Sequence, residues 1–141
     1  MSMLSRSDVF FSKRLFFLLA VVIGIGGMAS LAKSLDIFRQ PVVNVEHLVG
    51  GDWALHIIVS TTLGFVAAWA TPKSFYQYAK VPISPWVWLL LVAVSIDEFS
   101  QAYFPLRQFS LADLAINLSG VTMGSLTYLL YATIRYPSYL R

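Results

Sequence analysis

The 141-residue chain contains no cysteine and has few charged residues. The absence of cysteine excludes disulfide scaffolds, thiolate catalysis and cysteine-ligated zinc. Only 12% of the residues are charged, about half the share found in soluble domains, whereas 57% are hydrophobic and the mean hydropathy is +0.70. Because so few polar side chains are available to cover a surface in water, the composition predicts an integral membrane protein. The net charge of +3 therefore indicates basic cytoplasmic loops, and no nucleic-acid partner is expected.

Four apolar segments are long enough to cross a bilayer, which takes about 20 helical residues. They cover approximately residues 15–31, 52–70, 85–104 and 111–134. Ser84 is expected to cap the third segment, Pro105 to end it, and Ser110 to cap the fourth. The first segment follows basic residues, as a signal peptide does, but its apolar run exceeds the usual 7–15 residues, which favours an uncleaved helix. The prediction is an all-α chain: a single domain, residues 1–141, that forms an integral membrane bundle of four transmembrane helices.

The basic residues predict how this bundle is oriented. Seven flank the ends of the segments on one side, namely Arg6, Lys13, Arg14, Lys73, Lys80, Arg135 and Arg141. The other side has three, namely Lys33, Arg39 and Arg107. Because cytoplasmic loops carry the excess of Lys and Arg, both termini are expected in the cytoplasm (N-in/C-in) of a multi-pass plasma (inner) membrane protein.

Polar side chains from three segments fall in the half of the bundle that this orientation places outside. They are Asp52, His56, Glu98, Gln101, Arg107, Asp113 and Asn117. The first two are four residues apart, as are the last two, so each pair shares a helix face. Ionisable groups are costly in hydrocarbon and mark functional sites by default. The convergence predicts an outward-facing polar, ligand-binding pocket in which these charges are paired. Arg107 is expected to pair with Asp113 or Glu98, and His56 with Glu98 or Asp52.

Some of these residues also have structural interpretations. Asp52 follows two glycines and is equally suited to be a helix N-cap. Asp113 lies three residues after Ser110, as in a capping box. Asn117 suits an interhelical hydrogen bond, and Arg107 suits a snorkelling position at the interface.

His56 and Glu98 lie away from caps and interfaces, so they are the candidate catalytic residues if the protein is an enzyme. Gly120 and Gly124 form a GxxxG pattern, which predicts close helix packing.

Two blocks of residues form the most distinctive pattern. The first is Asp52-Trp53-Ala54-Leu55-His56, and the second contains Glu98-Phe99-Ser100-Gln101, Phe104-Pro105-Leu106-Arg107, Asp113-Leu114-Ala115-Ile116-Asn117, Gly120 and Gly124. This pattern, over about residues 52–124, resembles the VanZ-like family of membrane proteins. Trp53, Ser60 and Leu106 depart from the lysine, tyrosine and glycine usual in that family. The resemblance implies a link to low-level resistance to glycopeptides of the teicoplanin type, which act outside the plasma membrane.

The sequence is compatible with three functions. The favoured one is a non-enzymatic envelope protein whose pocket binds a lipid-linked or amphiphilic ligand, with a lipid-linked envelope precursor or a glycopeptide as partner besides the bilayer. The second is a membrane enzyme acting on a lipid-linked substrate, through a divalent metal or through His56 and Glu98 as acid and base. The third is a small lipid transporter or flippase, with a homo-oligomer as one option because four helices alone enclose little volume. No cofactor and no metal site are assigned from the sequence.

Overall fold

The computed structural model describes residues 12–22, 24, 28, 39–78, 83–105 and 108–136. All secondary structure in this part of the chain is helical, which confirms the all-α class. The helices are α2 (Lys13–Val21), α4 (Arg39–Val49), α5 (Asp52–Ala70), α6 (Lys73–Tyr78), α7 (Pro85–Ser100), the 3₁₀ turn η2 (Gln101–Tyr103) and α8 (Leu111–Arg135).

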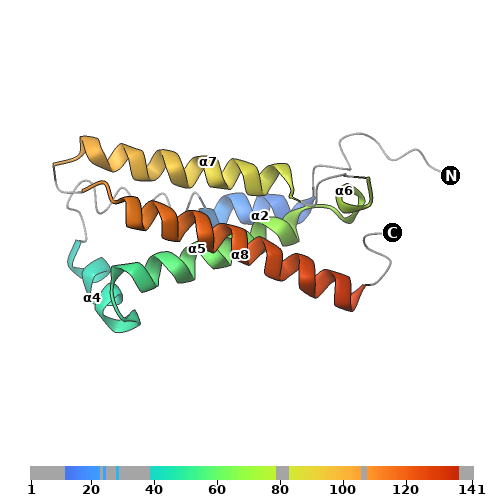
Figure 1. Cartoon of the computed structure of the whole chain (residues 1–141), viewed down its shortest axis with the longest axis horizontal. Helices are drawn as coiled ribbons and strands as arrows, with labels where there is room; N and C mark the ends of the chain where they lie inside the picture. The colour runs from blue at the N-terminus through green and yellow to red at the C-terminus, as the bar shows by residue number, and fades with distance from the viewer. Residues whose placement is uncertain are drawn as a thin grey trace.

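The long helices lie along one axis and alternate in direction (Figure 1). Helices α5 and α8 begin at the end of the molecule where α7 finishes, and α4 lies beside the start of α5. At the opposite end, the Ser12 hydroxyl donates to the Ala70 carbonyl and joins the start of α2 to the end of α5. Because α5 and α8 begin at the same end of the molecule, their polar first turns lie together there.

Three of the four segments expected from the sequence coincide with helices. These are α5, α7 continued by η2, and α8. The first expected segment overlaps α2, and most of its remainder lies outside the described residues. Among the described helices, α5 alone is long and apolar enough to cross a membrane, with 19 residues and a mean hydropathy of 1.5. Helices α4 and α6 were not predicted, because both regions were interpreted as loops.

Local signals account for the helix ends. The Ser84 hydroxyl accepts from the Val87 N–H at 3.3 Å, with Pro85 in the first turn, as expected for the cap of α7. The turn between α4 and α5 contains Gly50 and Gly51 at φ values of 103° and 114°. This left-handed backbone favours glycine, and it redirects the chain from α4 into α5.

Helices α5 and α8 pack backbone to backbone through glycines. A Cβ atom on Gly124 would overlap the Thr61 carbonyl oxygen, one on Gly120 would overlap the Ser60 side chain, and one on Gly64 would overlap Val121. The GxxxG pattern therefore packs helices, as expected. This close approach also sets which faces of α5 and α8 meet at their polar ends.

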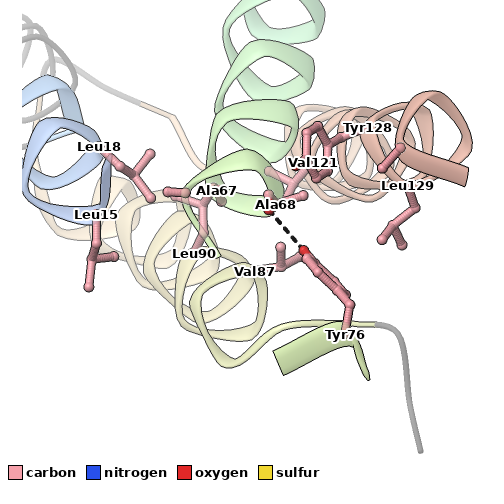
Figure 2. Packing of buried hydrophobic residues seen from close by; sticks show 12 residues of the cluster. Leu15, Leu18, Ala67, Ala68, Tyr76, Val87, Leu90, Val121, Tyr128 and Leu129 are labelled. Carbon is pink, nitrogen blue, oxygen red and sulfur yellow. Dashed lines mark hydrogen bonds between the residues drawn. The ribbon is translucent and has the colours of Figure 1, made fainter. Parts of the chain in front are cut away.

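The apolar core fills the other half of the bundle. Figure 2 shows side chains from α2, α5, α7 and α8 meeting there, with Tyr76 of α6 beside them. The Tyr76 hydroxyl donates to the Ala68 carbonyl at 2.9 Å, and burial raises the pKa of Tyr76 to about 12. Phe65 and Tyr128 pack edge to face, with ring centroids 5.4 Å apart. Packed apolar groups thus occupy the end of the bundle opposite the polar residues.

Candidate functional site

The candidate site is formed by the first turns of α5 and α8. Asp52 and His56 lie four residues apart on α5, and Asp113 and Asn117 lie four residues apart on α8. Each pair therefore lies on a single helix face. Because the glycine contacts hold the two helices close together, the four side chains form one cluster, which we call the mouth cluster.

His56 is the central residue of the mouth cluster. Its Nε2 atom lies 3.4 Å from Oδ2 of Asp52, and its Nδ1 atom lies 3.2 Å from Oδ1 of Asn117. Asp52, His56 and Asp113 each provide one potential ligand atom, and these atoms lie within 4.8 Å of one another. The imidazole ring therefore connects the two helices and lies close to both carboxylates.

The electrostatics of this cluster favour a positive charge in its centre. Asp52 and Asp113 bring two carboxylates into a small volume, and like charges at such a distance repel each other. A proton on His56, an ammonium group or a metal ion would offset that repulsion. The side chains of His56 and Asp52 are 21% and 45% exposed, so a ligand can reach them from outside the bundle.

The capping interpretations of the two aspartates are only partly correct. The N-cap of α5 is Gly51, and no side-chain hydrogen bond caps this helix, so Asp52 does not act as its cap. At α8, the Ser110 hydroxyl accepts from the Asp113 N–H at 3.2 Å, which is the expected half of a capping box. The reciprocal bond differs, because the Ser110 N–H donates to Glu98. The Asp113 carboxylate lies instead beside His56 and Asp52.

Glu98 joins the end of α7 to the start of α8. Its side chain is buried with 1% exposure, Oε2 accepts from Gln101 Nε2 at 3.0 Å, and Oε1 accepts from the Ser110 N–H at 3.1 Å. Both carboxylate oxygens thus hold the turn between the helices. Ser110 connects this pair to the mouth cluster, since its N–H binds Glu98 and its hydroxyl binds the Asp113 backbone.

The structure therefore places the expected site residues in two neighbouring groups. Asp52, His56, Asp113 and Asn117 form the mouth cluster, and Glu98 and Gln101 form the buried pair next to it. Arg107, with its expected pairing to Asp113 or Glu98, lies outside the described residues.

Ser110 was predicted from the sequence only as a cap. Its N–H bond to Glu98, 12 residues earlier, has no local signal, because it depends on how the chain turns between α7 and α8.

No protein family, curated protein or solved structure matches the chain. The resemblance to VanZ-like proteins accordingly depends on the residue pattern alone.

Proposed function

We propose that the protein is a VanZ-like, multi-pass protein of the plasma membrane whose four transmembrane helices carry an outward-facing pocket for a lipid-linked or amphiphilic ligand. Support for the membrane assignment comes from large apolar side chains exposed along α5, α7 and α8. These include Ile57, Ile58, Val59, Trp88, Leu89, Val92, Ile96, Met123, Leu126, Leu130 and Ile134. Soluble monomers rarely expose such extensive apolar surface, whereas lipid tails would cover it.

Helix length agrees with this assignment. Helix α8 has 25 residues, or about 37 Å at 1.5 Å per residue, which exceeds a hydrocarbon core of about 30 Å. Helix α5 has 19 residues, and α7 with η2 covers residues 85–103. The remaining helix of the proposed four begins with α2.

Basic side chains at the end where α5 and α8 finish support the N-in/C-in orientation. Where α5 and α8 finish, Arg14 lies over the Trp69 ring and Lys73 over the Tyr136 ring, each at 4.5 Å from the ring centroid. Basic and aromatic side chains of this kind anchor helices at the membrane interface, and a basic excess favours the cytoplasmic side. The mouth cluster lies at the other end and would face outward.

Helix α4 would extend this outer end along the membrane surface. Its residues Val45, Leu48 and Val49 recur at helical spacing and are exposed, as is Trp53 at the start of α5. These side chains could insert into the outer headgroup region beside the mouth cluster. An amphiphile in that leaflet would then have its headgroup next to Asp52 and His56.

The observation that carries the proposed function is the convergence of Asp52, His56 and Asp113 within 4.8 Å at an accessible helix end. Two carboxylates beside one imidazole favour a headgroup that bears an amine. Binding such a headgroup on an envelope precursor or a glycopeptide would connect this protein to teicoplanin-type resistance.

The test uses the full chain in detergent with EDTA, together with short-chain phosphatidylethanolamine and phosphatidylglycerol. We expect native mass spectrometry to show preferential retention of phosphatidylethanolamine, and Asp113→Asn to abolish that preference. Asp97→Asn, at an exposed position of α7 outside the mouth cluster, is the matched control and should behave as wild type. Equal retention of the two lipids, or an unchanged preference in Asp113→Asn, would contradict the proposal.

A membrane enzyme acting on a lipid-linked envelope substrate is the second candidate. It is favoured by the same cluster, because one imidazole and two carboxylates can hold a metal that activates water. Turnover of a lipid-linked precursor by the purified protein, lost in His56→Gln, would favour the enzyme. A lipid transporter is less favoured, because the packed core around Leu18, Ala67 and Leu90 closes the other half of the bundle.

A further inference from the structure

We propose that Asp52, His56 and Asp113 bind a divalent transition-metal ion, for which zinc is the natural probe. One ligand atom from each residue lies within 4.8 Å of the others. An imidazole nitrogen with two carboxylate oxygens suits zinc or manganese, whereas calcium and magnesium prefer oxygen ligands alone. The site is the one that the proposed function assigns to an amine headgroup and the enzyme candidate to a metal, but metal binding itself requires no amphiphile.

The distance between His56 and Asp52 fits two ligands of one metal ion. Nε2 of His56 and Oδ2 of Asp52 are 3.4 Å apart, which is longer than the roughly 2.7–2.9 Å of a charge-assisted hydrogen bond. Tetrahedral zinc ligands at about 2.0–2.1 Å from the metal are about 3.4 Å from one another. The other two separations both involve the Asp113 carboxylate and are at most 4.8 Å, so metal binding would require a rotation of the Asp113 side chain.

Asn117 orients the imidazole for this role. When His56 donates its Nδ1–H to Oδ1 of Asn117 at 3.2 Å, the Nε2 lone pair faces the Asp52 carboxylate. A lone pair and a carboxylate repel each other unless a positive charge, either a proton or a metal ion, lies between them. Metal-binding histidines commonly donate their second ring nitrogen to an oxygen in this way, so Asn117 is a positioning residue rather than a ligand.

Three protein ligands would leave part of the coordination shell open. Tetrahedral zinc has four positions, and sites with three protein ligands typically complete the shell with water or a ligand oxygen. The cluster lies at an accessible end of the bundle, so the open position can exchange with solvent. This arrangement belongs to binding or catalytic metal sites rather than to closed structural ones.

The experiment uses the full chain in detergent, purified through a tag without histidine and stripped with a chelator. The chain is well suited to it, because its only histidines are His47 and His56 and it has no cysteine. Calorimetric titration with zinc should show one ion per chain. Cobalt should give a visible absorption band from a low-symmetry nitrogen and oxygen site.

Variants separate the site from adventitious binding. His56→Gln and Asp113→Asn should each weaken zinc binding by more than about 100-fold, and Asn117→Ala by about 10–100-fold. His47→Gln, at an exposed position of α4, is the matched control and should bind as wild type. Circular dichroism and gel filtration establish that each variant is folded, and Asp52→Asn replaces any variant that is not.

The proposal is overturned if the wild type shows no saturable zinc or cobalt binding. It is equally overturned if His47→Gln weakens binding as much as His56→Gln does. Neither result affects the amphiphile assay, which contains EDTA, so a failure of the metal site and a failure of the proposed function can be told apart.

Discussion

Nδ1 of His56 on α5 lies 3.2 Å from Oδ1 of Asn117 on α8, 61 residues later in the chain. This contact joins the polar ends of the two helices that pack most closely. A hydrogen bond of this kind is worth about 1 kcal/mol net, and more when its loss leaves a partly buried partner unsatisfied. The pair therefore contributes to the shape of the mouth cluster as well as to helix packing.

Asn117→Ala should lower the free energy of unfolding by about 1 kcal/mol, because it removes the acceptor of the His56 ring. Thermal unfolding in detergent measures the change. Asn44→Ala is the control, since Asn44 is exposed on α4 and its bond to Gln40 is solvated. A smaller effect for Asn117→Ala than for Asn44→Ala would show that the His56 contact does not stabilise the fold.

Gly120→Leu should prevent the close approach of α5 and α8. A side chain at this position would collide with Ser60, and overpacking of this kind typically costs about 1–3 kcal/mol and occasionally more. The expected result is a large loss of folded protein, measured as membrane abundance and as monodisperse yield. Ala115→Leu, at an exposed position of α8, is the control. Normal yield of Gly120→Leu would contradict the packing shown by the structure.

Glu98→Gln should act on stability before it acts on function. Both Glu98 oxygens accept hydrogen bonds, and the amide replaces one acceptor with a donor that would face Gln101 or the Ser110 N–H. Leaving a buried group unsatisfied costs about 1–3 kcal/mol, so the melting temperature should fall. If the melting temperature stays unchanged while lipid or zinc binding is lost, Glu98 belongs to the binding site instead.

Single cysteines test the proposed N-in/C-in orientation, because the native chain has no cysteine. Gln77 is exposed on α6 and Gln108 is exposed just before α8, and Figure 1 shows α6 and the start of α8 at opposite ends of the molecule. A membrane-impermeant thiol reagent applied to intact cells should label a cysteine at position 108 and should not label one at position 77. The reverse pattern would invert the topology and place the mouth cluster in the cytoplasm.

Because the Tyr76 hydroxyl is buried, we expect the protein to lose stability at high pH. Burial raises its pKa from 10.0 to about 12, so the neutral form is favoured in the folded state. The contribution of Tyr76 to the free energy of unfolding is complete below about pH 10 and is lost toward pH 12, because the Tyr76 hydroxyl ionises at a lower pH in the unfolded chain than in the folded protein. The melting temperature of the wild type should therefore fall more steeply between about pH 10 and pH 12 than the melting temperature of Tyr76→Phe. Equal slopes for the two proteins would contradict the burial of the hydroxyl.

The sequence by itself determined the features that depend on neighbours within a few residues. Ser84 and Ser110 cap α7 and α8 as expected, because a hydroxyl reaches an N–H three residues along the same chain. Asp52 lies beside His56, as the sequence predicted, because side chains four residues apart share a helix face. Helix α4 was not predicted because its 11 residues are too few to cross a bilayer and a proline lies near its start.

Tertiary structure alone decided which helix faces meet. Glycine contacts between α5 and α8 set their separation and rotation, and this brings Asn117 and Asp113 to His56. The turn after η2 takes the Ser110 N–H to Glu98 and leaves the Asp113 carboxylate beside the imidazole. Hydrogen bonds and metal sites require atoms to meet within a few ångströms, and between helices that distance depends on packing along their whole length rather than on local residue spacing.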